Sequence, residues 1–155
     1  MEKPIVAADH PRAGEVAAGL ERLVSLIRWL SPPGLSLTSA ATLATLEKSG
    51  PCRLTDLAAR EGVTQPAMTQ LVARLADSGL VDRCADPGDG RVVHVRITDA
   101  GRDLVARRRA SRAERLSGLM TRLSQEDQDA LAAALPAMQA LASVRRDPLE
   151  PSAHD

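Results

Sequence analysis

Two short helix patterns separated by a glycine constrain the fold of this chain more than any other feature. The first pattern covers residues 56–60, with Thr55 placed to cap it and Gly62 placed to end it. The second covers residues 65–75 and follows Thr64, whose hydroxyl is placed to cap it. Two short helices joined by a glycine-containing turn predict a helix-turn-helix.

The segment that follows predicts a β-hairpin. Residues 87–90 read Pro-Gly-Asp-Gly, which favours a tight turn, and the flanking residues 80–83 and 92–97 alternate or are rich in β-branched side chains. Arg91 then stands near the hairpin tip, from which a guanidinium could enter a DNA groove. In an arbitrary hairpin a solvated turn residue is the commoner case, but the preceding helices favour a winged helix-turn-helix.

Longer helices are predicted on both sides of this unit. Residues 11–30 carry an apolar stripe at helical spacing, and Ser31-Pro32-Pro33-Gly34 ends that helix. Thr38 is placed to cap the next helix. Downstream, Thr98 is placed to cap a long helix, and Ser124 with Asp127 opens a last one.

These boundaries divide a single domain of residues 1–155 into parts. A winged helix-turn-helix core spans about 37–98, long helices span about 11–35 and 99–144, and the apolar-poor residues 145–155 are expected to be disordered. The predicted fold class is mainly α with a small β-hairpin wing.

Composition limits the core and the function. Only 1% of the residues are aromatic, so the core must be built from aliphatic side chains and Met. Twenty basic and twenty acidic residues give a net charge of zero, so a DNA-binding face must come from local arrangement. This neutrality keeps open a second hypothesis, a winged-helix module that binds proteins.

The sequence offers no sign of catalytic or metal chemistry. His10, His94 and His154 lie far apart in sequence, no glycine-rich phosphate loop follows a strand, and the two cysteines have no metal-ligand spacing. We therefore expect no enzyme activity, no metal and no cofactor. The absence of an apolar leader or an apolar run of spanning length predicts a cytoplasmic protein that does not enter the membrane.

Over about residues 16–141 the chain resembles the bacterial MarR family of transcriptional regulators. The matching segments are Leu54–Ala58, Gly62–Thr69, Leu71–Leu75 with Gly79–Val81, and the wing from Asp89-Gly90-Arg91 to Ile97-Thr98 with Gly101. The resemblance implies a homodimer held by the N- and C-terminal helices. It also implies a transcription factor, most often a repressor, that binds a pseudo-palindromic operator and is released by a small ligand or an oxidant.

The candidate DNA-binding residues lie on the second short helix and on the wing. At the N-terminal end of a recognition helix, Gln can pair with adenine, Arg with guanine, and Thr can offer a hydroxyl or a methyl group. The candidates are Thr64, Gln65, Pro66, Thr69, Gln70 and Arg74 on the helix, and Asp89 and Arg91 on the wing. The resemblance implies that Asp89 holds Arg91 for entry into the minor groove. Thr64 could act only as a cap, and Arg74 could reach a phosphate instead of a base. Arg83 and Arg96 remain open between phosphate contact and simple exposure.

The resemblance also implies a ligand pocket between the terminal helices and the winged core. Arg28, Trp29 and Leu30 are the candidates, since Trp29 could stack on a small aromatic or phenolic acid and Arg28 could meet its carboxylate. Core or dimer packing for the tryptophan and surface exposure for the arginine are the alternatives. Redox sensing by Cys52 or Cys84 is a minor alternative. The run Arg107-Arg108-Arg109 is interpreted as a solvated face, which could flank DNA or pair with a partner subunit.

Overall fold

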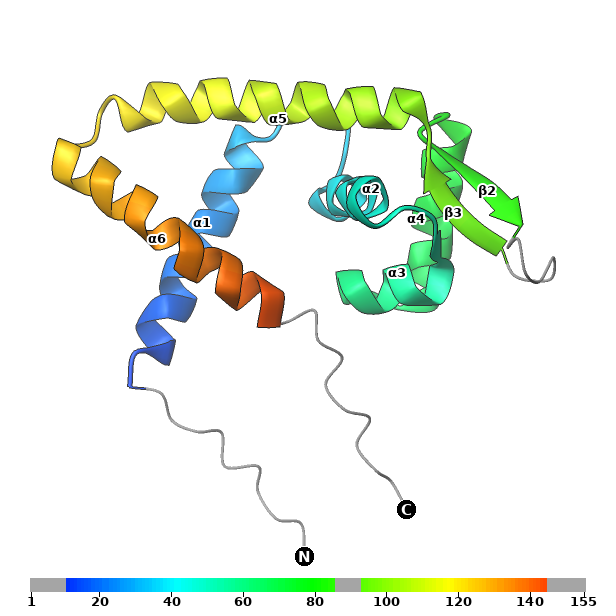
Figure 1. The fold of residues 1–155 in the computed structure, drawn as a ribbon, viewed down its shortest axis with the longest axis horizontal. Helices are drawn as coiled ribbons and strands as arrows, with labels where there is room; N and C mark the ends of the chain where they lie inside the picture. The colour runs from blue at the N-terminus through cyan, green and yellow to red at the C-terminus, as the bar shows by residue number, and fades with distance from the viewer. Residues whose placement is uncertain (1–10, 86–92, 145–155) are drawn as a thin grey trace, which may run out of the picture.

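The computed structural model describes residues 11–85 and 93–144 (Figure 1). In these ranges the elements are α1 (Ala13–Leu30), α2 (Leu37–Ser49), β1 (Cys52–Arg53), α3 (Leu54–Glu61), α4 (Gln65–Asp77), β2 (Val81–Ala85), β3 (Val93–Ile97), α5 (Asp99–Met120) and α6 (Gln125–Val144). The predicted turn at 87–90 and the tail at 145–155 lie outside the described residues. The mainly helical fold class with a small wing is confirmed.

The wing is part of a three-stranded antiparallel sheet in the order β1-β3-β2. Val95 of β3 pairs with Arg83 of β2 on one side and with Cys52 of β1 on the other. The expectation of a two-stranded hairpin was therefore incomplete. A short strand near Cys52 was expected, but its two residues have too little alternation to predict that it joins the sheet of the wing.

The core lies in the winged unit, between α2, α3, α4 and the sheet. Its fully buried hydrophobic side chains are aliphatic or Met, as the composition requires; the largest are Leu43, Leu46, Leu57, Met68, Val72, Val81 and Val95. They come from the apolar positions of each element, so helix and strand periodicity meet in one cluster.

Three predicted helix caps are confirmed and two are wrong. The Ser124 hydroxyl at the start of α6 accepts a hydrogen bond from the Asp127 N–H at 3.1 Å. Thr64 caps α4 and Thr98 caps α5, each accepting a hydrogen bond from a backbone N–H three residues later. Helix α2 is capped by Ser36 rather than Thr38; the Ser36 hydroxyl accepts a hydrogen bond from the Ser39 N–H at 3.0 Å. Thr55 caps nothing, because β1 leads directly into α3 and the helix begins at Leu54.

Helix α5 connects the two ends of the molecule (Figure 1). The winged unit lies at its N-terminal end, and α1 and α6 lie toward its C-terminal end. Helix α6 buries no residue in the chain, and most of the apolar stripe of α1 is exposed. None of the described helices is long and apolar enough to cross a bilayer.

Candidate DNA-binding surface

The turn between α3 and α4 is set by Gly62. This residue has φ 66° and ψ 36°, a left-handed conformation that glycine adopts without a Cβ penalty. The Gly62 N–H donates to the Ala59 carbonyl at 3.3 Å, and the Val63 N–H donates to the Ala58 carbonyl at 3.0 Å. The chain then enters α4 through the Thr64 cap, so the two helices form the predicted helix-turn-helix.

Helix α4 has one buried face and one exposed face. Met68, Leu71, Val72 and Leu75 point into the core. All six sequence-predicted residues of this helix and its cap are exposed; they are Thr64, Gln65, Pro66, Thr69, Gln70 and Arg74. The structure therefore brings them together on one polar surface.

The polar groups of this surface are available to a partner. The Thr69 hydroxyl donates to the Gln65 backbone carbonyl at 2.9 Å. The lone pairs of the Thr69 hydroxyl and the Thr69 methyl group stay available on the outer face. In the described ranges no hydrogen bond or ion pair engages the side chains of Gln65, Gln70 and Arg74. Two amides and a guanidinium with free donors are the groups that recognise base edges and phosphates.

A short network fixes α4 relative to the wing and α5. The Leu80 N–H donates to the Leu75 carbonyl at 2.9 Å as α4 ends. The Thr98 hydroxyl donates to the Gly79 carbonyl at 2.7 Å and accepts from the Gly101 N–H at 3.1 Å. The end of α4, the end of β3 and the start of α5 thus meet at one residue.

The wing residues Asp89 and Arg91 lie outside the described residues. On the described strands, Arg83 is exposed and Arg96 pairs with Asp82 at 3.4 Å, with both partners of this pair more than half exposed. An exposed pair of this kind contributes little to stability. Both arginines remain candidates for phosphate contact.

The three predicted ligand residues do not come together in a cavity. Arg28 is exposed, the Trp29 side chain is 65% exposed, and Leu30 is buried. One cavity, of about 400 Å³, lies where β3 meets α5 and is lined by charged groups that include Arg96 and Arg102. A second, of about 290 Å³, lies between α1, α2 and α5. Neither is lined by any of the three residues.

The interpretation of residues 107–109 as a solvated face is wrong for Arg108, whereas Arg107 and Arg109 are exposed. Arg108 is only 6% exposed and donates to the Pro33 carbonyl at 3.2 Å. Arg109 forms an ion pair with Glu47 of α2 at 2.6 Å. Arg108 lies on the buried side of α5 with Gly101 and Val105, at positions one or two turns apart, and this helical spacing was the signal that charge alone concealed.

The described residues offer no metal site, and Cys52 is a poor candidate for thiol chemistry. In the ranges 11–85 and 93–144 no group of three or more His, Cys, Asp or Glu could hold a metal ion. Cys52 is buried, and burial raises the pKa of its thiol. A thiol that stays protonated is a poor nucleophile, which argues against Cys52 as an oxidant sensor.

Comparison with known proteins agrees with this geometry. The family model described as MarR family matches residues 35–93, which contain the helix-turn-helix and the start of β3. The chain is 36% identical over 135 residues to the helix-turn-helix transcriptional regulator Mb0904 of Mycobacterium bovis, covering 86% of this chain and 94% of that protein. The chain belongs to the MarR family. It is a transcriptional regulator of the helix-turn-helix type, and its family and relatives are not enzymes.

Other similarities extend the comparison. Over 81 residues this MarR-family chain is 36% identical to the transcriptional repressor Rv2887 of Mycobacterium tuberculosis, covering 52% of the chain and 58% of the repressor. A solved structure of a probable transcriptional regulator from Pseudomonas aeruginosa is 28% identical with a TM-score of 0.60, over 82% of this chain and 96% of that one. The fold also matches the PcaV regulator of Streptomyces coelicolor, solved with its natural ligand, at 24% identity and a TM-score of 0.55 over 92% and 99% of the two chains.

Proposed function

We propose that this MarR-family regulator is a homodimeric repressor that binds a pseudo-palindromic operator through α4. The observation that carries the proposal is the outward face of α4, where the polar side chains from Thr64 to Arg74 are exposed and the amides are unpaired. An α-helix fits the major groove, where Gln pairs with adenine and Arg with guanine. We assign base reading to Gln65, Thr69 and Gln70, and base or phosphate contact to Arg74. Thr64 and Pro66 shape the helix start that faces the groove.

The wing completes the proposed interface. Arg91 follows Asp89 by two residues at the predicted hairpin tip, and we assign Arg91 to the minor groove with Asp89 as its support. A narrow A·T-rich minor groove has a strong negative potential that attracts arginine. The zero net charge of the chain makes this local placement important, because no general positive field would hold the protein on DNA.

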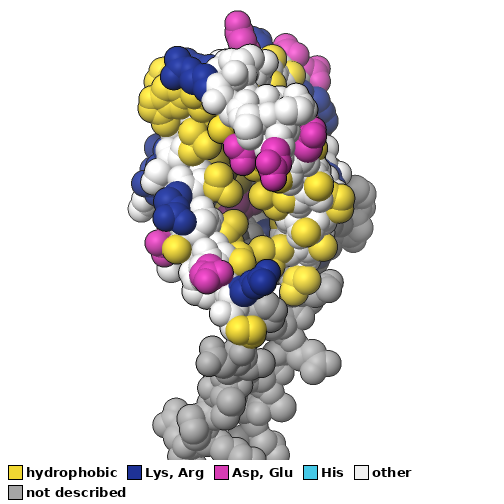
Figure 2. Space-filling model, turned by 90° about the vertical axis from the view of Figure 1, so that its left-hand side faces the viewer, with side chains coloured by type: hydrophobic (Ala, Val, Ile, Leu, Met, Phe, Trp, Pro, Cys, Tyr) yellow, Lys and Arg dark blue, Asp and Glu magenta, His cyan; other side chains and the backbone are white. Residues whose placement is uncertain are grey.

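The partner that we propose for the terminal helices is a second copy of the chain. Val16, Leu20 and Val24 expose an apolar stripe on α1, and Leu135 and Leu141 of α6 are each more than half exposed. Figure 2 shows hydrophobic side chains gathered at this end of the molecule around a hollow. Contiguous apolar patches on soluble proteins mark interaction sites, and a two-fold dimer matches the two half-sites of an inverted repeat.

We further propose that a small organic acid releases the dimer from its operator. The sequence suggested a small aromatic or phenolic acid at Arg28, Trp29 and Leu30. Support for an acid comes instead from the 290 Å³ cavity between α1, α2 and α5, which has apolar walls and arginines.

The repressor assignment rests on the similarity to Rv2887, and the cytoplasmic location rests on the function, since a bacterial repressor acts where the chromosome is.

Selection from genomic DNA tests the operator proposal. Purified protein is mixed with a library of genomic duplex fragments at two salt concentrations, with three variants in parallel. The first carries Gln70→Ala and Arg74→Ala, the second carries Arg91→Ala, and the control carries Lys48→Ala at an exposed basic residue of α2. We expect a short inverted repeat to be enriched by the wild type and by the Lys48 variant, and lost by the other two.

The same selection identifies the alternative function. If binding is weak, independent of sequence and abolished by salt in all four proteins, the α4 face does not read DNA. The winged unit would then be a protein-binding module, and the proposal would be rejected.

A further inference from the structure

The link between the sheet and α5 is a single residue. Strand β3 ends at Ile97 and α5 begins at Asp99, so Thr98 alone connects them. The Thr98 N–H donates to the Leu80 carbonyl at 3.1 Å, and the Thr98 carbonyl accepts from the Arg102 N–H at 3.0 Å. Because hydrogen bonds are directional, a one-residue link that is bonded on both sides leaves α5 little freedom to turn relative to the sheet.

The Thr98 side chain extends this link to the end of α4. Helix α4 closes in a turn where the Gly79 N–H donates to the Ala76 carbonyl at 2.8 Å and the Leu80 N–H donates to the Leu75 carbonyl at 2.9 Å. Gly79 has φ 69°, the left-handed conformation in which many helices end. Its carbonyl accepts from the Thr98 hydroxyl at 2.7 Å. The turn that ends α4 is therefore bonded directly to the residue that caps α5.

The one hydroxyl of Thr98 has two roles that substitution can separate. Its hydrogen goes to the Gly79 carbonyl, and its oxygen accepts from the Gly101 N–H at 3.1 Å, which is the cap of α5. Threonine and serine can donate and accept at once, whereas an ionised aspartate only accepts. Aspartate at this position would keep the cap of α5 and lose the bond to α4.

Apolar packing by itself leaves the angle of α4 loosely defined. The buried face of α4 lies against the core, and apolar contacts have no preferred direction, whereas a hydrogen bond does. The bond between Thr98 and Gly79 lies at the C-terminal end of α4, and the proposed base-reading residue Gln65 lies at the N-terminal end. The helix is thus oriented from the end opposite to Gln65.

A small rotation at this junction is large on the scale of DNA. Helix α4 has 13 residues, which corresponds to a length of about 20 Å at about 1.5 Å per residue. A rotation of about 10° about its C-terminal end would move its N-terminal end by about 3 Å, roughly the rise of one base pair. A loosened junction would therefore accept half-sites that are one base pair too close or too far apart.

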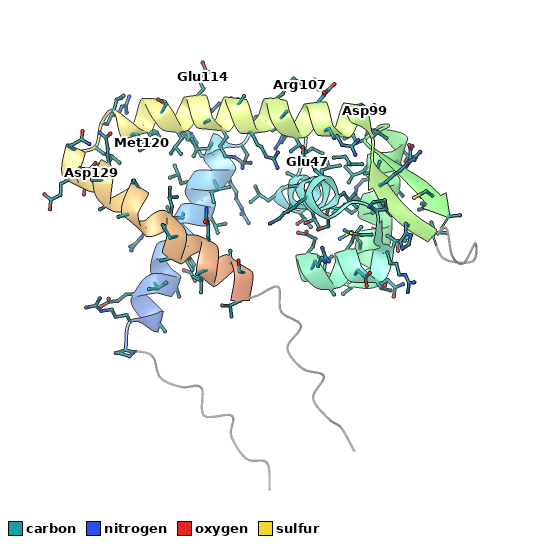
Figure 3. The ribbon with its side chains drawn as sticks, in the orientation of Figure 1. Glu47, Asp99, Arg107, Glu114, Met120 and Asp129 are labelled. Atoms are coloured by element: carbon teal, nitrogen blue, oxygen red, sulfur yellow. The ribbon has the colours of Figure 1, made fainter. Side chains whose placement is uncertain are left out.

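We propose that Thr98 is a positioning residue of the DNA-binding surface. Its hydroxyl bond to Gly79 sets the angle between α4 and α5, and in the dimer it sets the half-site spacing that the two copies of α4 accept. Figure 3 shows Asp99 at the sheet end of α5 and Met120 at the opposite end, toward the terminal helices that we assign to the dimer. The proposal rests on the proposed function, because the spacing is that of the operator.

Operator affinity measured against half-site spacing tests this role. The selected inverted repeat is compared with versions that have one base pair more or one fewer between the half-sites. The wild type and Thr98→Ser should bind both altered versions about tenfold or more weakly than the selected repeat. Thr98→Val, which loses both bonds of the hydroxyl, and Thr98→Asp, which keeps the cap, should bind all three within about threefold.

Ser36→Ala is the matched control. It removes the bond from the Ser39 N–H that caps α2, at 3.0 Å, and so destabilises a helix of the same winged unit without touching α4. It should keep the spacing preference of the wild type. Thermal unfolding identifies the folded variants, and either Thr98→Val or Thr98→Asp is sufficient. The proposal is overturned if the wild type does not discriminate between spacings, if the folded variants discriminate as it does, or if Ser36→Ala loses discrimination.

Amide hydrogen exchange without DNA distinguishes failure of this proposal from failure of the proposed function. In Thr98→Val and Thr98→Asp the amides of Gly79 and Leu80 should exchange about tenfold or more faster than in the wild type, and in Thr98→Ser and Ser36→Ala at the wild-type rate. Unchanged exchange in the folded Thr98 variants would overturn the proposal whether or not an operator is found. Faster exchange without any selected operator would reject the proposed function and support the hold of Thr98 on α4.

Discussion

Gly101→Ala should destabilise the protein although it replaces glycine by the best helix former. Gly101 lies in the first turn of α5, where that helix approaches the end of α4 and the last residue of β3. A Cβ built on Gly101 would collide with the Leu80 carbonyl oxygen and would stand 2.7 Å from Cγ1 of Ile97. The Leu80 carbonyl is backbone and already accepts from the Thr98 N–H at 3.1 Å, so it cannot move aside without breaking the network at Thr98.

Two opposing effects set the size of the stability loss expected for Gly101→Ala. Replacing a helical glycine by alanine stabilises by about 1 kcal/mol, and overpacking a close contact costs about 1–3 kcal/mol. Since the contact involves backbone as well as a core side chain, we expect the upper part of that cost and a net loss of about 1–2 kcal/mol. For a chain of this size such a loss lowers Tm by about 2–8 °C.

Thermal and urea unfolding at one protein concentration measure this effect, with Gly118→Ala as the matched control. Gly118 lies in the same helix, and a Cβ there meets nothing within 4 Å. Gly118→Ala should leave stability unchanged or raise it by up to about 1 kcal/mol. Equal stabilities for the two variants would refute the close packing that we describe at the junction of α4, the wing and α5.

Three further predictions concern the cap, the dimer and a thiol. Thr64→Ala should lower the free energy of unfolding by about 0.5–1 kcal/mol in urea, with Thr64→Ser as a neutral control; no loss would contradict the cap. Val24→Glu places a charge on the exposed stripe of α1 and should yield monomers in sedimentation at concentrations where the wild type is dimeric; a dimeric variant would contradict the proposed interface. Burial raises the pKa of the Cys52 thiol above its unfolded value, so the folded state keeps its proton longer. The stability that this raised pKa contributes to the folded state is fully present below the unfolded pKa of about 8.5, and it is lost as pH rises through the folded pKa. Between pH 8 and 10 the free energy of unfolding should therefore fall more steeply for the wild type than for Cys52→Ala. Parallel plots of unfolding free energy against pH for the two proteins would contradict the raised pKa of Cys52.

The sequence predicted those elements whose apolar residues recur at a regular helical or strand spacing. The apolar positions of α4 recur at helical spacing after a threonine cap, so its start and its exposed face could be assigned in advance, although the helix continues to Asp77, two residues beyond the predicted end. The resemblance to MarR proteins then gave the exposed face a role. Family membership is now shown by the comparisons, whereas the roles of single residues on α4 and on the wing remain proposals.

What the sequence did not predict depends on contacts between distant residues. Arg108 looks solvated in a run of three arginines, and its burial follows from the packing of α5 against the turn after α1. The strand β1 is defined by its partner β3 rather than by its own two residues. Trp29 lies on the side of α1 opposite the apolar stripe. It is 65% exposed because the rest of the chain does not cover that side of the helix.

The central claim is that α4 reads operator bases, and a base-by-base affinity profile tests it most directly. Each base pair of one half-site is changed symmetrically in the selected inverted repeat, and affinity is measured for the wild type and for Gln65→Ala, Gln70→Ala and Arg74→Ala. The wild type should discriminate at each contacted pair by about 1–3 kcal/mol, and each glutamine variant should lose discrimination at its own pair while keeping it elsewhere. If the profiles of all three variants match that of the wild type, α4 does not read the operator and the account is contradicted.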